Sequence, residues 1–167
     1  RASPPSATAS STAALVRFQS VADNVKGAVS VLEQAGVNKI VVLSHIGYKV
    51  DQDLAAAVPG IDLIVGGHSH TLLSNTDAKA AGPYPTMVTN PDGVDVPIVQ
   101  AGEYGKYLGE IKVVWDDSGK VVSATGEPML LDASVTPDED FVAKLAELSR
   151  PLESLKAYVT VVGAVAP

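Results

Sequence analysis

NKIVVLSHIGYKVDQDLAAAVPGIDLIVGGHSH, residues 38–70, is the stretch of this 167-residue sequence that decides its fold. It contains two short apolar runs, 40–43 and 61–65, and the residues between them have a helical pattern. Apolar runs of this length on either side of a helix are typical of parallel strands buried on both faces of a sheet. The stretch therefore predicts a strand–helix–strand crossover whose two strands end side by side.

All three histidines of the chain come directly after these two runs. His45 follows the first run, and His68 and His70 follow the second, in the sequence GGHSH. Side chains beyond the carboxyl ends of parallel strands line the crevice where α/β proteins bind ligands, and neutral imidazole is a common metal ligand. A packed histidine without a ligand is the alternative at each position, but three at adjacent strand ends favour a metal site. Gly66 and Gly67 would let the chain approach an ion closely.

Two helices are expected around this stretch. Ser20 is a capping residue for the first, which Gly36 ends, and its apolar stripe is expected to pack on the sheet (Val21, Val25, Ala28 and Leu32). The second helix, inside the crossover, is expected at 51–58. Asp51 is open to two interpretations there, a cap of this helix or a catalytic carboxylate.

The rest of the chain predicts mostly strands. Strands are expected at 87–89 and 96–99 around an Asn-Pro-Asp-Gly turn, and a hairpin at 107–124 whose turn holds solvated acidic residues. Thr136 and Pro137 predict the start of a helix that is kinked at Pro151, and its apolar stripe is Phe141, Leu145, Leu148 and Leu152. The segments 14–18 and 158–165 are strand-like.

Composition excludes several classes of protein. A hydrophobic fraction of 46% is too high for a mainly disordered chain. The formal net charge of −7 argues against a nucleic-acid surface, and no apolar run is long enough to span a membrane. Cysteine is absent, so no disulfide indicates the redox compartment.

Longer segments resemble a known family. LSHIG (43–47) and GGHSH (66–70), joined by DQDLAAAVPGIDLIV (51–65), resemble the second half of the metallophosphoesterase domain of secreted 5′-nucleotidases. That family includes UDP-sugar hydrolases and 2′,3′-cyclic-nucleotide phosphodiesterases. The resemblance continues through GPYPTMVTNPDGVDVPIVQAGEYGKYLGEIKVVWDDSGKV (82–121) and extends over about residues 12–163.

The resemblance implies an α/β fold: a partial metallophosphoesterase-like sheet layered with helices, with a β-hairpin region, at residues 13–157. A flexible tail at 1–12 would precede it, and 158–167 would start a linker toward a further domain. The implied chemistry is hydrolysis of a nucleotide phosphate ester on two metal ions, zinc or manganese. His45 and His68 are implied as ligands of one ion, and His70 as a ligand or close neighbour of the other. The implied location is secreted or periplasmic, with any signal peptide outside this numbering.

The chain also departs from the family. It has no Asp-x-His and no Asn-His-Glu motif, so no catalytic residue and at most one weakly bound ion are expected here, and the substrate-binding residues stay unknown. Three hypotheses follow. The chain is part of a nucleotidase that is active only with the missing N-terminal half, or it is a non-catalytic fragment that binds or inhibits another protein chain. In the third hypothesis, the histidines keep a single metal for an independent hydrolytic role.

Overall fold

The structure is a computed structural model that describes residues 19–163, and the expectations for 1–12 and 14–18 lie outside this range. The chain forms two compact units, which divide between Leu130 and Leu131. The first unit contains the helices α1 (Val21–Gln34) and α2 (Tyr48–Ala57) and the strands β1 (Val41–Leu43), β2 (Leu63–Val65), β3 (Thr86–Thr89), β4 (Asp95–Val99), β5 (Tyr107–Trp115) and β6 (Val121–Leu130). The second unit contains α3 (Glu139–Gly163). None of the helices among the described residues is long and apolar enough to cross a membrane.

The crossover expected at residues 38–70 is present, and it places β1 next to β2 in parallel. Val41 pairs with Leu63, and Leu43 pairs with Val65, so the two strands end level with each other. The four-stranded sheet has the order β1-β2-β4-β3, in which β3 and β4 form the antiparallel pair expected around the Asn-Pro-Asp-Gly turn. The predicted α/β fold with a partial sheet is confirmed.

Different elements cover the two faces of this sheet. On one face, Leu54 of α2 and Val58, the residue after this helix, pack with Ile64 and Ile98, and Val29 of α1 joins this core. On the other face lies the predicted hairpin of β5 and β6, whose Ile111 packs near the core formed by Leu63, Leu73, Tyr84 and Val99. The first unit therefore has three layers: helices, sheet and hairpin.

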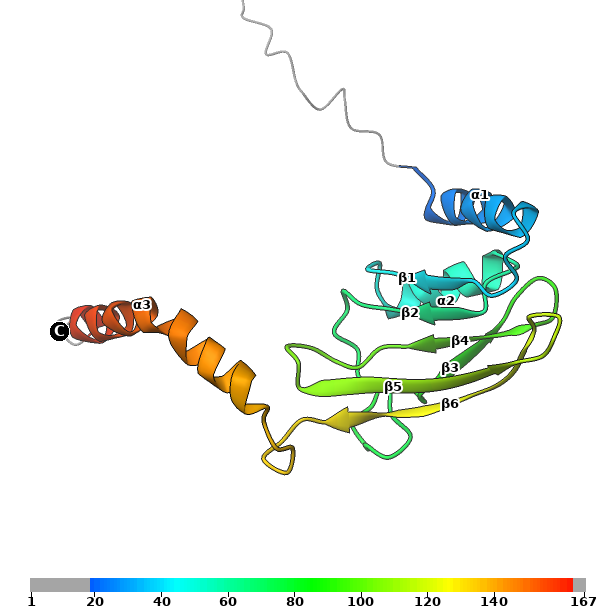
Figure 1. Cartoon of the computed structure of the whole chain (residues 1–167). Coiled ribbons are helices and arrows are strands. Elements are labelled where there is room, and N and C mark those ends of the chain that lie inside the picture. The colour runs from blue at the N-terminus through cyan, green and yellow to red at the C-terminus, as the bar shows by residue number, and fades with distance from the viewer. Residues whose placement is uncertain (1–18, 164–167) are drawn as a thin grey trace, which may run out of the picture. The chain divides into compact units, whose positions relative to one another are not determined.

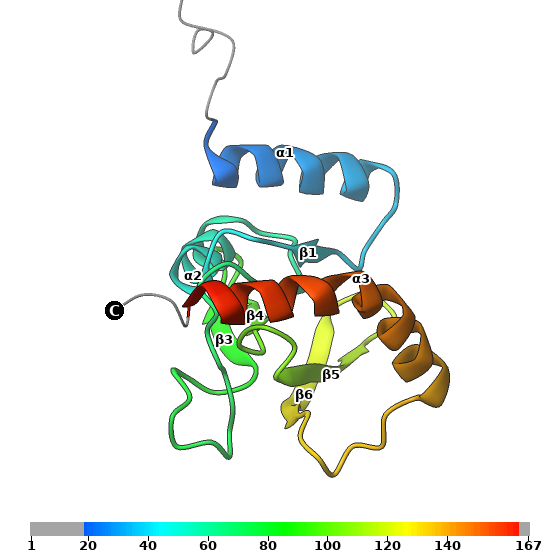
Figure 2. The same ribbon diagram turned by 90° about the vertical axis from the view of Figure 1, so that its left-hand side faces the viewer.

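Helix α1 is capped as expected but buries a different face. The Ser20 hydroxyl accepts a hydrogen bond from the Asp23 amide, and Gly36 has the positive φ of a helix stop. Of the expected stripe, Val25 contacts the core together with Ala22 and Val29, whereas the other three members, Val21, Ala28 and Leu32, are exposed. Figures 1 and 2 both place α1 on the β1 side of the unit, away from the hairpin.

Several predicted boundaries and one predicted element are wrong. The second strand of the hairpin, β6, continues to Leu130, six residues beyond its predicted end. Helix α2 starts at Tyr48, three residues before the predicted start. Helix α3 starts at Glu139, because the Asp138 carboxylate, and not Thr136, accepts hydrogen bonds from the amides of Asp140 and Phe141. Residues 158–163 are helical instead of a strand. A strand needs a neighbour to satisfy its backbone hydrogen bonds, whereas a helix satisfies them internally.

Helix α3 contains Pro151 and changes direction along its length in Figure 1, as expected for a kinked helix. Its predicted apolar stripe, from Phe141 to Leu152, is exposed.

Candidate functional site

His45 and His68 lie together beyond the ends of β1 and β2. Their ring centroids are 5.3 Å apart, and the ring planes meet at 72°. Both side chains are exposed, so the pair faces solvent. The adjacency of the strand ends, which brings these two histidines together across 22 intervening residues, follows the topology expected from the sequence.

The separation of the two rings fits two imidazoles that share one ion. Imidazoles that bind a metal at about 2.1 Å with a roughly tetrahedral angle between them have ring centroids about 5 Å apart. Among the described residues, however, no group of three or more histidine, cysteine, aspartate or glutamate side chains is arranged to hold a metal. The pair therefore fits part of a coordination shell, and further ligands are needed to complete it.

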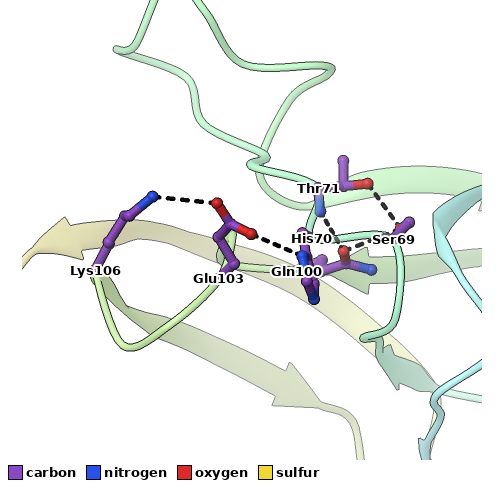
Figure 3. A network of polar contacts seen from close by, with 6 residues as sticks. All are labelled: Ser69, His70, Thr71, Gln100, Glu103 and Lys106. Atoms are coloured by element: carbon purple, nitrogen blue, oxygen red, sulfur yellow. Dashed lines mark hydrogen bonds and ion pairs between the residues drawn. The ribbon is translucent and has the colours of Figure 1, made fainter. Parts of the chain in front are cut away.

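The third histidine turns toward a different group. His70 Nδ1 lies 2.7 Å from Glu103 Oε2 (Figure 3). The His70 ring also makes an edge contact with the ring of Tyr104, at 5.5 Å between centroids. Because Glu103 occupies Nδ1, Nε2 is the ring nitrogen left for another partner. Metal-binding histidines commonly have this arrangement, in which a carboxylate holds the ring nitrogen that does not bind the ion.

Glu103 is held in turn by Lys106, whose ammonium lies 3.1 Å from Glu103 Oε1 (Figure 3). The hydrogen bond from Lys106 holds the pKa of the Glu103 carboxyl below its usual range, and His70 acts in the same direction. Glu103 therefore carries its charge at neutral pH and remains an acceptor for His70. No sequence pattern singles out this glutamate, which lies 33 residues after His70.

Gln100, one residue beyond β4, organises the loop that carries His68 and His70. Its side-chain oxygen accepts hydrogen bonds from the Thr71 amide at 2.5 Å and the Ser69 hydroxyl at 3.1 Å (Figure 3). Its side-chain nitrogen donates to the Gly67 carbonyl at 3.1 Å. Gln100 is only 4% exposed. A polar residue directly after the apolar β4 was a signal that sequence reasoning did not use.

The glycines before His68 are required by protein atoms and not only by a bound ion. A Cβ atom at Gly66 would lie 2.3 Å from Asp51 Oδ2, and one at Gly67 would lie 2.8 Å from His45 Nδ1. Both distances are shorter than real Cβ contacts. The close approach in the structure is to Asp51 and His45, and the approach to an ion stays a prediction.

Asp51 does not cap α2. The residue at the helix start is Gly47, and the Tyr48 amide donates instead to the Ser69 hydroxyl at 3.0 Å, so the histidine loop itself caps α2. Asp51 lies in the first turn, fully buried, and accepts a hydrogen bond from the Ser44 hydroxyl at 2.5 Å. The interpretation of Asp51 as a cap is therefore wrong.

Burial raises the pKa of the Asp51 carboxyl above its ordinary value, although the hydrogen bond from Ser44 acts in the opposite direction. Between the ordinary and the raised pKa the folded state binds more protons than the unfolded state, so stability falls as the pH rises through this interval. Relative to an Asp51→Asn variant, the free energy of unfolding should decrease from about pH 4 toward neutral pH. Urea unfolding of both proteins across this range measures it, and parallel pH curves would contradict it.

Comparisons with known proteins place this geometry in a family, although no family model matches the chain. The chain is 38% identical over 143 residues to snake venom 5′-nucleotidase of Crotalus adamanteus, which covers 83% of this chain and 24% of the relative. It is 46% identical over 121 residues to the 5′-nucleotidase of Bos taurus, covering 70% of this chain and 21% of the relative. The solved 5′-nucleotidase precursor from Thermus thermophilus is 43% identical, with a TM-score of 0.78 over 83% of this chain and 28% of that one.

This chain belongs to the 5′-nucleotidase family. The resemblance read from LSHIG and GGHSH is thereby confirmed. The family is in general metal-dependent, which agrees with paired imidazoles at a strand end. This chain spans about a quarter of the length of the relatives named above.

Proposed function

We propose that this chain supplies part of the two-metal centre of a secreted or periplasmic 5′-nucleotidase, with His45 and His68 as ligands of one ion. The observation that carries the proposal is the pair of exposed imidazoles, 5.3 Å apart, at the ends of two parallel strands in a chain of this family. Zinc and manganese are the ions whose ligand preference includes imidazole together with the carboxylates that such a centre needs.

We assign His70 to the second ion, as a ligand or close neighbour. Glu103 holds Nδ1 of His70, which leaves Nε2 for the metal and keeps the ring in one orientation. When bound, the ions activate a water molecule and neutralise charge on the phosphoryl oxygens of a nucleotide. In this proposal the chain holds each imidazole so that a free ring nitrogen faces the ion, and it sets the distance between the rings of His45 and His68.

The remaining ligands are proposed to come from polypeptide that pairs with β1. This strand is at the edge of the sheet in the described part of the chain, and its Leu43 and Val41 side chains are 80% and 46% exposed. Parallel strands are normally buried on both faces, so an exposed apolar edge favours a missing neighbour. His45 follows β1 by two residues, so the histidine pair lies next to this edge, where a neighbouring strand could add further ligands. The isolated chain should then bind at most one ion weakly and hydrolyse no nucleotide.

The same exposed edge favours a second candidate function, non-catalytic association with another protein chain. In that case an added strand would pair with β1 without contributing metal ligands. The two candidates differ in whether the histidines of this chain can support catalysis once the rest of the domain is present.

A chimera distinguishes them. We would replace the matching segment of the Thermus thermophilus precursor with this chain and measure phosphate release from AMP in the presence of manganese or zinc. The chimera should hydrolyse AMP, and His68→Ala within it should lower kcat/KM by about 100-fold or more, because an ion loses one of its ligands.

Lys49→Ala is the matched control, because Lys49 is exposed on α2 and pairs only with Asp53 among the described residues. This variant should keep the activity of the chimera. A folded, metal-loaded chimera without activity would support the non-catalytic candidate. If His68→Ala left the activity of the chimera unchanged, His68 would not be a metal ligand.

A further inference from the structure

A buried carboxylate lies beneath the histidine pair. Asp51 is 0% exposed, and its Oδ2 atom has no hydrogen-bond partner among the residues that the structure describes. No ion pair to Asp51 is found in the same part of the chain. Burying a polar oxygen without a partner is unfavourable, and an apolar residue of similar volume would fill this position without that penalty. Packing alone therefore does not explain an aspartate here.

One oxygen of Asp51 holds the segment that carries His45. Oδ1 accepts the hydrogen bond from the Ser44 hydroxyl, and the Ser44 amide donates to the Val65 carbonyl at 2.9 Å. Ser44 is thus fixed both to α2, through its side chain, and to the end of β2, through its backbone. His45 is the next residue, so this hydrogen bond restrains the direction in which its ring leaves β1.

The other oxygen lies against the segment that carries His68. Oδ2 faces the Cα of Gly66 so closely that a Cβ there would lie 2.3 Å from it. The Gly66 amide donates to the Val99 carbonyl at 2.8 Å, which holds this segment to β4. The carboxylate therefore stands between the two histidine-bearing segments, attached to the first turn of a rigid helix.

We propose that Asp51 is a positioning residue for the histidine pair: bridging Ser44 and Gly66, it sets the separation at which the rings of His45 and His68 meet. The proposal deepens the metal site proposed above and rests on it. Asp51 acts on the ion only through the two imidazoles.

The test uses the ring protons of the full chain, which has only three histidines and hence few imidazole signals. In the unmodified, metal-free chain, rings in edge contact should give a nuclear Overhauser effect between His45 and His68. Ser44→Ala and Asp51→Ala should each abolish this cross-peak. Asp51→Asn should keep it, since the amide oxygen still accepts from Ser44. Asp53→Ala, on the exposed side of the same helix, should leave it unchanged.

Zinc titration by calorimetry gives the second measurement. Loss of a residue that orients metal ligands typically weakens metal affinity about 10- to 100-fold, and we expect this for Ser44→Ala. If Asp51→Ala does not fold, Ser44→Ala decides the question, because it removes the same hydrogen bond with a smaller change. An unchanged cross-peak in folded Ser44→Ala would overturn the positioning role. The chimera described above tests the proposed metal site separately: a loss of its activity in His68→Ala supports that site, whereas the cross-peak of the metal-free chain tests the role of Asp51.

Discussion

Replacement of Gly66 by alanine is expected to lower the free energy of unfolding by about 3 kcal/mol, near the upper end of the effects of overpacking. The added methyl group would lie 2.3 Å from Asp51 Oδ2 and 3.2 Å from Gln100 Nε2. Both neighbours are buried, and both already hold other groups, so neither can move aside without breaking a hydrogen bond. The strain comes from close contact, since Gly66 is not among the residues with a positive φ.

Gly27→Ala is the matched control for this prediction. Gly27 lies inside α1, and a Cβ there would meet nothing within 4 Å. Alanine is a better helix former than glycine, so this variant should gain about 0.5–1 kcal/mol. Urea unfolding of both variants measures the difference. A Gly66→Ala protein as stable as the unmodified chain would mean that Asp51 and Gln100 are not wedged against this glycine.

The crossover, the hairpin and the β3–β4 turn could be predicted from the sequence because local patterns determine them. The apolar runs 40–43 and 61–65 form the parallel strands β1 and β2, although Val41 and Leu43 of β1 are exposed, and the Asn-Pro-Asp-Gly sequence turns the chain between β3 and β4. The adjacency of His45 and His68 follows from the same topology.

Apart from the start of α3, where Asp138 caps the helix locally, the errors depend on a partner that is distant in sequence or outside the described residues. Helix α2 begins at Tyr48 because the hydroxyl of Ser69, in the loop after β2, accepts a hydrogen bond from the Tyr48 amide. The burial of α1 depends on which elements lie beside it, so its apolar stripe alone did not identify the buried face. Residues 158–163 have strand propensity but no described neighbour with which to pair.

The polar groups of the site were the hardest to predict. Gln100 and Glu103 lie about thirty residues from the loop that they hold, and no local pattern links them to it. The sequence leaves Asp51 open as a helix cap or a catalytic carboxylate, because its burial between two strand ends is a tertiary property. His70 was grouped with the other histidines by spacing, yet its side chain contacts Glu103.

Gln100→Glu is expected to destabilise the chain by about 2–3 kcal/mol at neutral pH, although it replaces a single NH₂ group by oxygen. Oε1 can still accept from the Thr71 amide and the Ser69 hydroxyl. The group that donated to the Gly67 carbonyl becomes a carboxylate oxygen, so two acceptors face each other at a buried position. The loop with His68 and His70 should then separate from β4, which hydrogen exchange of the Thr71 amide would report as faster exchange.

The pH dependence of this variant identifies the cause. A protonated glutamic acid can donate to the Gly67 carbonyl, and both this hydrogen bond and burial favour the neutral form, so the pKa of the introduced carboxyl should be raised in the folded state. The defect relative to the unmodified chain should therefore be small at acid pH and grow as the pH rises through that pKa. Gln34→Glu, at an exposed position on α1 where the side chain contacts only Ser30 among the described residues, should show neither effect. A loss of stability that is the same at every pH would indicate altered packing around residue 100. It would contradict the view that the hydrogen bond from Gln100 to the Gly67 carbonyl holds the histidine loop in place.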